Sequence, residues 1–254
     1  MRWLMVAALL LGGGGAARAA EIQVMISGGF TAAAQVLAPR FERESGHRVV
    51  LVQGGSMGTA PTAIPMRLGR GEAADALIMV GSALDGLAAE GRVVAGSRVE
   101  LANSAIGMAV REGAARPDIS TVDKLRATLL AARSLGYSAS ASGRYVNGPL
   151  FEKLGIAAEM QGRGRLVSGE AVASAVARGE LELAFQQVAE LLPVRGVTFV
   201  GPLPEAVQLY TVFAGGVASG AREPAAAAAL LRYLAGPEAR AAVLESGLLP
   251  LPGR

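Results

Sequence analysis

The chain has 254 residues, of which 52% are hydrophobic, 18% charged and 4% aromatic. It contains no cysteine and one histidine, which excludes disulfides, thiolate nucleophiles and cysteine-rich or histidine-rich metal sites, so we expect neither a metal nor a cofactor. The formal charge of +3, with scattered basic residues and few aromatic ones, lacks the footprint of a nucleic-acid binder. A chain of this length can form one or two domains.

Residues 1–19 have the pattern of a secretory signal peptide. Arg2 gives a basic start, Leu4–Leu11 is a short apolar run, and the small residues Ala17 and Ala19 precede the expected cleavage after Ala19. The run is shorter than the roughly 20 residues that cross a bilayer. The sequence therefore predicts an exported, soluble protein. Loss of Arg2 and Arg18 leaves it 22 basic and 21 acidic residues.

The mature chain opens with alternating strands and helices. We expect strands at residues 21–27, 49–52 and 76–80, with helices at 32–44 and around 64–68. Glycine-rich turns follow the first two strands, at Gly28–Thr31 and Gly54–Gly58. Three strands that alternate with helices predict an α/β layer with a mostly parallel sheet.

The middle of the chain repeats this pattern as a second α/β set. Its expected strands are 105–110, 134–138, 181–185 and 197–200, and its expected helices are 122–132, 146–154 and 172–178. A strand at 207–213 and helices at 224–234 and 238–244 close the chain.

No flexible linker separates the two sets, so strands are expected to connect them as a hinge. The outward crossing is expected near Leu101–Ser104 and the return near Gly201–Pro204. We predict one lobe from residues 20–102 and 211–254, and a second lobe from residues 103–210.

Four turns rich in glycine and serine are candidates for binding an anion. Ser27-Gly28-Gly29 and Gly54-Gly55-Ser56 follow strands of the first set, and Ser138–Arg144 and Ser168-Gly169-Glu170 lie in the second. A helix N-terminus offers free N–H groups and partial positive charge, and serine adds a neutral donor. Each turn alone is more often structural, but their recurrence favours a shared cleft. Gln187 ends a strand and is either solvated or directed into that cleft.

Catalytic motifs are missing, so we expect a binding protein rather than an enzyme. The sequence has no HExxH metal motif and no GxSxG nucleophile elbow. Asp75 and Glu190 are interpreted as structural acids, and His47 as a loop residue after a helix-ending glycine. An exported enzyme that uses the cleft, for example through His47, stays an alternative.

The order of these motifs resembles the periplasmic molybdate-binding protein family of ABC importers. The resemblance covers nearly the whole mature chain, through short motifs of moderate specificity. The matching segments are residues 27–30, 54–58, 71–78, 142–144, 179–185 and 236–240.

The resemblance implies a type II two-lobed α/β fold, with a mixed sheet in each lobe, that captures a small oxyanion in the periplasm. The implied partner is an ABC permease at the inner membrane, and we expect a monomer. From the family, Ser27, Ser56, Ser142 and the helix start near Gly169 and Glu170 are the implied donors. With the neighbouring turn residues and Gln187, the expected ligand-binding residues are Ser27, Gly28, Gly29, Gly55, Ser56, Met57, Ser140, Ser142, Gly143, Arg144, Gly169, Glu170 and Gln187.

Two features depart from the family pattern. Gln187 stands where the family has a tyrosine, and the segment Thr59–Pro65 lengthens the chain after Ser56. Both leave open a different anion, such as a small organic carboxylate. A carboxylate more naturally recruits an arginine, and Arg144 is the nearest candidate, although a cation at a helix start usually turns outward.

Overall fold

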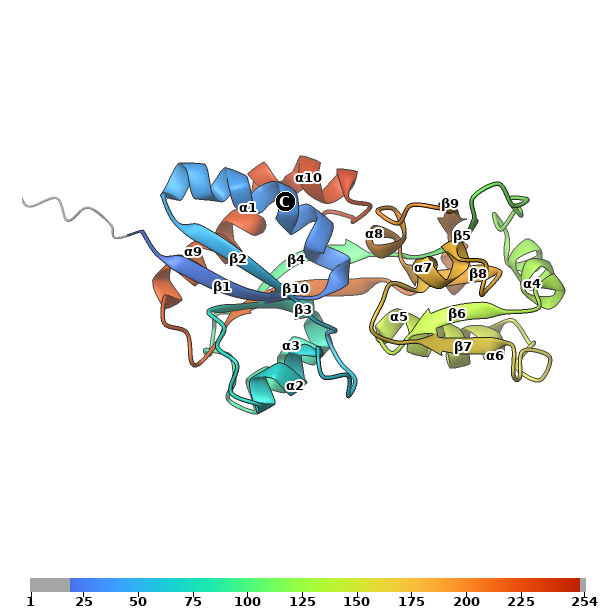
Figure 1. Ribbon diagram of the computed structural model, residues 1–254, viewed down its shortest axis with the longest axis horizontal. Coiled ribbons are helices and arrows are strands. Elements are labelled where there is room, and N and C mark those ends of the chain that lie inside the picture. The colour runs from blue at the N-terminus through green and yellow to red at the C-terminus, as the bar shows by residue number, and fades with distance from the viewer. Residues whose placement is uncertain (1–18, 252–254) are drawn as a thin grey trace, which may run out of the picture.

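The computed structural model describes residues 19–251, which form two five-stranded mixed sheets, each flanked by helices (Figure 1). The strands are β1 (Glu21–Ile26), β2 (Arg48–Gln53), β3 (Ala76–Val80), β4 (Val99–Ser104), β5 (Ile106–Arg111), β6 (Leu135–Ser138), β7 (Gly164–Val167), β8 (Leu183–Gln187), β9 (Val197–Pro202) and β10 (Thr211–Val217). The predicted α/β fold class is confirmed. The expected signal peptide, residues 1–19, lies outside the described residues except for Ala19.

The first sheet, with its helices, is called lobe I. Its strand order is β2-β1-β3-β10-β4, in which β1 is parallel to β2 and β3, and β10 is antiparallel to β3 and β4. Its helices are α1 (Gly28–Ser45), α2 (Ile64–Gly69), α3 (Gly81–Ala89), α9 (Pro224–Leu234) and α10 (Arg240–Glu245). Figure 1 shows α2 and α3 on the opposite side of this sheet from α1 and α10.

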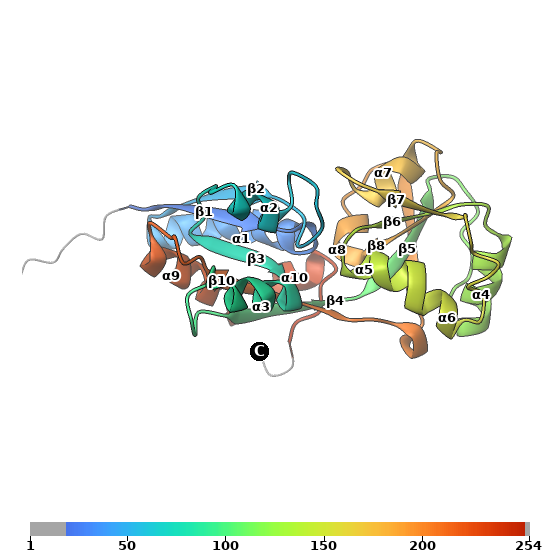
Figure 2. The ribbon, with the colours of Figure 1, turned by 90° about the horizontal axis from the view of Figure 1, so that it is seen from below.

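The second sheet, with its helices, is called lobe II and has the strand order β7-β6-β8-β5-β9. In this lobe β6 is parallel to β7 and β8, whereas β5 is antiparallel to β8 and β9. Its helices are α4 (Val122–Ala131), α5 (Ala141–Tyr145), a π-helical turn (Val146–Leu150), α6 (Phe151–Lys153), α7 (Val172–Ala177) and α8 (Val188–Leu191). Figure 2 shows the two lobes side by side along the long axis.

Two chain crossings connect the lobes. β4 ends at Ser104 and β5 begins at Ile106, while the return runs from Pro202 to Thr211. Gln208 of the return crossing forms two hydrogen bonds with the outward one. Its Oε1 accepts the Ile106 N–H at 2.9 Å, and its Nε2 donates to the Ile106 carbonyl at 3.0 Å. The predicted lobe boundaries at residues 102/103 and 210/211 stay predictions.

Each lobe buries its own apolar clusters, and one helix joins the two. The main lobe I cluster packs Phe30, Leu37 and Phe213 against α9 and α10, and it includes Ala189 of α8. The main lobe II cluster packs β5, β6 and β8 against α4 and the π-helical turn. Helix α8 therefore belongs to the lobe II sequence and packs on both lobes, with Ala189 in the lobe I cluster and Leu191 in a lobe II cluster.

Several expected elements were misplaced by the sequence patterns. The expected polar turn at residues 102–104 is the end of β4, and the strand expected at 207–213 begins only at Thr211. A 3-10 turn occupies Glu205–Val207 instead, because the Tyr145 hydroxyl donates to the Val207 carbonyl at 2.7 Å. Gln186 and Gln187, expected after a strand, lie within β8.

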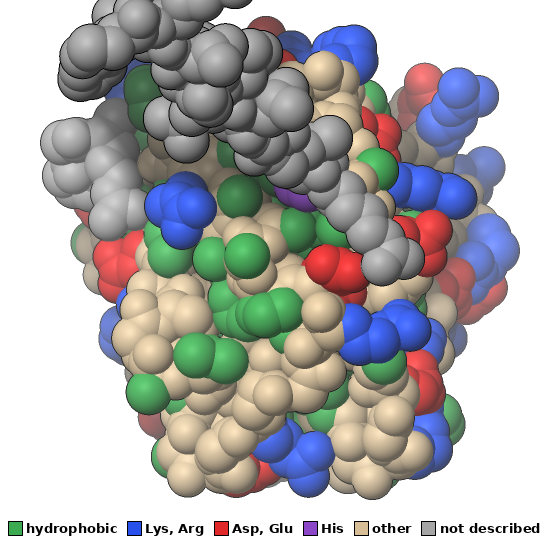
Figure 3. Space-filling view, turned by 90° about the vertical axis from the view of Figure 1, so that its left-hand side faces the viewer, with side chains coloured by type: hydrophobic (Ala, Val, Ile, Leu, Met, Phe, Trp, Pro, Cys, Tyr) green, Lys and Arg blue, Asp and Glu red, His purple; other side chains and the backbone are tan. Residues whose placement is uncertain are grey.

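The end of the molecule where the chain enters β1 carries basic and acidic side chains side by side at its rim (Figure 3). The centre of this face is mostly hydrophobic side chains and backbone. This face therefore offers no continuous basic surface. Within residues 19–251, no helix has the length and apolar character needed to span a membrane.

Candidate functional site

The carboxyl ends of the strands in both lobes meet where the chain crosses between them. In lobe I, β1, β3 and β4 end at one edge, where the antiparallel β10 begins at Thr211. In lobe II, β6, β7 and β8 end at the edge where the antiparallel β5 begins. Because β4 runs into β5 through the single residue Ala105, these two edges face each other. We call this region the lobe junction; it is where open α/β sheets place ligands.

Ser27 lies between β1 and α1, and its hydroxyl is buried without a hydrogen-bond partner. Its backbone N–H donates to the Ile78 carbonyl at 2.9 Å, which fixes the residue to the end of β3. Ser27 is the N-cap of an 18-residue helix, yet its side chain makes no capping bond. The hydroxyl and the partial positive charge of the α1 N-terminus are both available to a ligand.

Ser56 holds the second glycine turn to the end of β3. Its Oγ accepts the backbone N–H of Val80 at 3.0 Å, and the residue is 3% exposed. The added segment Thr59–Pro65 folds back beside this turn, where the Ile64 N–H donates to the Gly55 carbonyl at 2.9 Å. The segment is thus part of the wall of the junction.

Lobe II contributes a chain of three serine hydroxyls. Ser140 Oγ lies 2.7 Å from Ser138 Oγ and 3.0 Å from Ser142 Oγ, and Ser142 is fully buried. The next residue, Gly143, packs so closely on the Ser138 carbonyl that a Cβ there would overlap it. The loop between β6 and α5 therefore requires glycine at this position.

Arg144 follows these serines and reaches across the junction. Its guanidinium contacts the thioether sulfur of Met57 in lobe I. The side chain is exposed and belongs to the rim of the junction, so the expectation that it turns outward holds only in part. Among the predicted ligand residues, Arg144 carries the positive charge, and it lies at this rim.

The two glutamines at the end of β8 have different roles. Gln186 Oε1 accepts the Val172 N–H at 2.9 Å, which caps α7. The N-cap of α7 is Ala171, whose side chain makes no capping bond. Gln187 Nε2 donates to Thr211 Oγ1 at 3.0 Å, which links lobe II to lobe I, while its Oε1 is buried without a partner. Gln187 therefore lies at the junction, and its role in binding a ligand stays a prediction.

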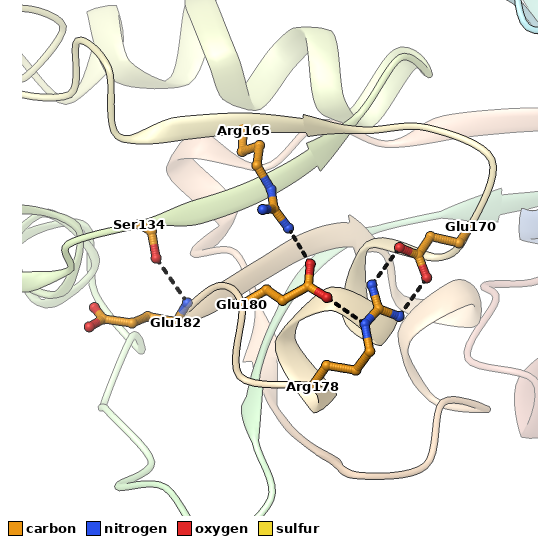
Figure 4. Close-up of polar contacts among 6 residues, drawn as sticks. All are labelled: Ser134, Arg165, Glu170, Arg178, Glu180 and Glu182. Atoms are coloured by element: carbon orange, nitrogen blue, oxygen red, sulfur yellow. Dashed lines mark hydrogen bonds and ion pairs between the residues drawn. The ribbon is translucent and has the colours of Figure 1, made fainter.

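Gly169 and Glu170 are exposed, and the Glu170 side chain turns away from the junction. Its carboxylate receives two bonds from Arg178, at 2.7 and 2.8 Å, and Arg178 also binds Glu180 (Figure 4). The Arg178 guanidinium lowers the pKa of the Glu170 carboxyl. Any contribution of this turn to a ligand must therefore come from the backbone.

Glu190 is a junction residue whose importance the sequence reasoning missed. It occupies the third position of α8, where the carboxylate of a capping box reaches back to the N-cap N–H. The Gln187 N–H and the Gln186 side chain donate to its carboxylate, while Oε2 is buried without a partner. Burial raises the pKa of this carboxyl to about 7. The available signal in the sequence was an acid three positions after Gln187, the spacing of a capping box at the start of a helix.

Two further buried groups complete the junction. Ser104, at the end of β4, is fully buried with an unpartnered hydroxyl, and it pairs in register with Thr211. Sequence patterns gave no signal for either, because the pairing of β4 with β10 brings together residues more than 100 positions apart.

His47 lies at the opposite end of β1 from the junction. Its Nδ1 accepts the Ala20 N–H at 3.1 Å, just before the strand begins. Its ring is tilted against Phe41, with 6.1 Å between the ring centres. The role of His47 is therefore to close the start of the first sheet.

The structure also shows that the junction is closed over its polar groups. Ser27, Ser56, Ser142 and Gln187 are each less than 5% exposed. Two hollows on the surface lie elsewhere, one beside α10 and one lined by Arg116–Ser120 and Val200–Pro204. Access to these polar groups from solvent therefore requires the lobes to separate. Among the described residues, no cluster of three or more acidic or histidine side chains could hold a metal ion.

Residues 22–249 match the family described as bacterial extracellular solute-binding protein. The chain belongs to this family. The implied membership in a periplasmic binding protein family is confirmed, whereas the molybdate branch of it is not.

Two solved structures of this family's fold resemble the chain. The Azotobacter vinelandii periplasmic molybdate-binding protein has a TM-score of 0.75 and 20% identity, over 91% of this chain and 99% of that chain. The sulfate-binding protein SubI of Mycobacterium tuberculosis has a TM-score of 0.69 and 14% identity, over 92% of this chain and 88% of that chain. At these identities the likeness establishes the fold alone, which is the predicted type II two-lobed arrangement.

A curated relative is much closer in sequence. An aconitate isomerase from a Pseudomonas species is 43% identical over 233 residues, which is 92% of this chain and 89% of that protein. The expectation that this solute-binding protein is not an enzyme is therefore wrong. The search for catalytic motifs covered metal-binding and nucleophile-elbow patterns, which mark only some classes of enzyme.

Proposed function

We propose that this solute-binding protein is an exported isomerase that interconverts the geometric isomers of aconitate or a close analogue. The supporting observation is the 43% identity with the aconitate isomerase, spread over 92% of this chain. Aconitate is an unsaturated tricarboxylate, which is the organic carboxylate ligand left open by Gln187 and the segment Thr59–Pro65.

The donors at the lobe junction suit a ligand with several carboxylates. Hydroxyls of Ser27, Ser56 and Ser142, the Gln187 amide and the α1 N-terminus offer neutral hydrogen bonds, and Arg144 offers a bidentate cation. The amide of Gln187 can present either its oxygen or its nitrogen to the ligand, because the Thr211 hydroxyl can donate as well as accept. The proposed binding residues are those predicted from the sequence: Ser27, Gly28, Gly29, Gly55, Ser56, Met57, Ser140, Ser142, Gly143, Arg144, Gly169, Glu170 and Gln187.

The chemistry of aconitate indicates what the protein must supply. Its methylene group is allylic to the carbon–carbon double bond and adjacent to a carboxylate, so loss of a proton leaves a delocalised carbanion. Return of a proton to the other allylic carbon moves the double bond and allows its geometry to change. One C–H bond breaks and one forms, so no oxidant, reductant or metal is consumed. The requirement is a base in a site that excludes water.

Export and capture complete the proposal. We infer that residues 1–19 direct the chain to the periplasm and are removed there, and that the hinge crossings let the lobes close on the substrate as a monomer.

A second candidate is the capture of a molybdate-like oxyanion for an ABC permease at the inner membrane. It is favoured by the serine hydroxyls at the ends of β1, β2 and β6, which are neutral donors suited to a tetrahedral dianion. The fold of the Azotobacter protein supports it at the level of architecture.

A binding and turnover panel separates the two candidates. Purified protein is titrated with both aconitate isomers, the saturated analogue tricarballylate, molybdate, tungstate and sulfate, and each mixture is then analysed for conversion by liquid chromatography. We expect the tricarboxylates to stabilise the protein and the aconitates alone to be converted. Stabilisation by tetrahedral oxyanions alone, with no conversion, would remove the isomerase proposal.

A further inference from the structure

Two acids in this chain have buried carboxylate oxygens in opposite environments. Asp75 is 1% exposed, and its carboxylate accepts the N–H groups of Gln23, Arg222 and Glu223 at 2.7 to 3.0 Å. Each of its oxygens is therefore satisfied, as expected for a structural acid. Glu190 instead retains one buried oxygen, Oε2, without a partner. A buried carboxyl group with an unused oxygen is costly unless something binds there.

The carboxylate of Glu190 lies beside the predicted ligand site. Its other oxygen, Oε1, packs on Gly28, the first residue of α1, so closely that a Cβ at Gly28 would overlap it. The neighbouring residue, Ser27, carries another buried hydroxyl without a partner. Gln187, three positions before Glu190, carries a third unpartnered atom. Four such atoms occur in the described chain, on Ser27, Ser104, Gln187 and Glu190, and all belong to the lobe junction.

The remaining contacts hold the carboxyl in place without neutralising it. The Gln186 side chain and the Gln187 N–H donate to it, and Gln186 is itself fixed to the start of α7. The groups in contact with the carboxyl are Gly28 of α1 and Gln186 and Gln187 of β8, none of which is charged. Burial is the main cause that raises its pKa to about 7, close to neutral pH where a base is most effective.

We propose that Glu190 is the catalytic base that carries the allylic proton, an inference that rests on the proposed isomerase function. Its carboxylate takes a proton from the substrate methylene, so that a C–H bond breaks and an O–H bond forms. The electron pair spreads over the allyl unit and the adjacent carboxylate. The same O–H then returns the proton to the other allylic carbon, which restores Glu190 and shifts the double bond. Gln186 is a positioning residue that holds the carboxyl in place.

The test compares Glu190→Gln with Glu182→Gln, a matched control at a surface ion pair with Arg133. Glu190→Gln keeps the size of the side chain and resembles the protonated acid. We expect its Kd for aconitate, by calorimetry, to stay within about threefold of wild type while kcat falls about 100-fold or more. Glu182→Gln should match wild type in both. A purely structural role would move Kd and kcat together.

The pH profile and a second variant sharpen the result. Wild-type kcat should rise with pH to a plateau above about 7, and Glu190→Asp should retain that rise with a kcat at least about tenfold lower. Should Glu190→Gln lose its fold, judged by circular dichroism, Glu190→Asp decides, and an unchanged kcat in that variant overturns the proposal.

The failure of this inference is distinct from the failure of the proposed function. A wild-type protein that converts aconitate while Glu190→Gln keeps its kcat overturns Glu190 alone. A wild-type protein that binds but never converts either isomer overturns the isomerase and the base together.

Discussion

Glu190 of α8 and Gly28 of α1 are in contact across the lobe junction, so that the carboxylate of one lobe lies on the helix start of the other. This contact exists only because position 28 has no Cβ. It places an acid with a raised pKa next to the buried hydroxyl of Ser27.

Gly28→Ala should therefore lower activity more than stability. The added methyl group displaces the flexible end of Glu190, and alanine is favoured over glycine in a helix, so the free energy of unfolding should change by no more than about 1 kcal/mol. We expect kcat to fall about tenfold, measured by conversion of aconitate. Gly86→Ala in α3 is the control, because nothing lies within 4 Å of a Cβ there. Equal activity in both variants would contradict the contact.

Glu190→Gln should also change how stability depends on pH. The pKa of Glu190 is raised in the folded protein, so the folded state holds this proton more tightly than the unfolded chain does. The protonated carboxyl contributes fully to the free energy of unfolding below about pH 4.5, and this contribution is lost as pH rises through about 7, a difference of roughly 3 kcal/mol. When urea unfolding is measured from pH 5 to 8, the free energy of unfolding of Glu190→Gln should therefore rise relative to that of wild type by about this amount. A constant difference across this range would show that Glu190 ionises normally.

Asp75→Asn should destabilise the fold. The amide replaces an oxygen that accepts buried N–H groups with a donor, so we expect a loss of about 3 kcal/mol in the free energy of unfolding. The measurement is the urea midpoint of the purified variant. Activity per folded molecule should stay near wild type, because Asp75 joins β1 to the start of α9 and not to the junction. Normal stability would contradict its structural role.

Arg144→Gln should weaken the binding of aconitate more than that of molybdate. The arginine is the cation that the predicted ligand residues bring to the rim, and a bidentate pair with a carboxylate contributes about 1.5 to 3 kcal/mol. Calorimetry should show a Kd for aconitate raised at least about tenfold. Arg133→Gln, at an exposed ion pair, serves as the control. An equal loss of affinity for aconitate and molybdate would show that Arg144 does not discriminate between a carboxylate and an inorganic oxyanion.

Local patterns predicted much of the fold. The helix Pro224–Leu234 was predicted at its observed bounds, since proline at the start and an apolar stripe are properties of the segment itself. The glycine and serine turns after β1 and β2 were also found, because turn chemistry is local. The two-lobed α/β arrangement followed from the order of these elements, and its type II character was implied by the family resemblance.

The errors arose where distant residues decide the structure. Gln186 was not recognisable as the cap of α7, because its partner Val172 approaches only through the pairing of the lobe II sheet. The segment before β10 is bonded to Tyr145, whose hydroxyl donates to the Val207 carbonyl, 62 positions away. Glu190 was interpreted as structural because its contact with Gly28 joins residues from opposite lobes. The enzyme class was missed because the motifs that were sought mark only metal-dependent and nucleophile-elbow enzymes.

The central claim is tested most directly by proton nuclear magnetic resonance of the purified protein with pure cis-aconitate and, separately, with pure trans-aconitate. The account predicts that both samples approach the same final ratio of isomers, at rates proportional to protein concentration. Isomer ratios that stay equal to those of protein-free samples, while binding is observed, would contradict it.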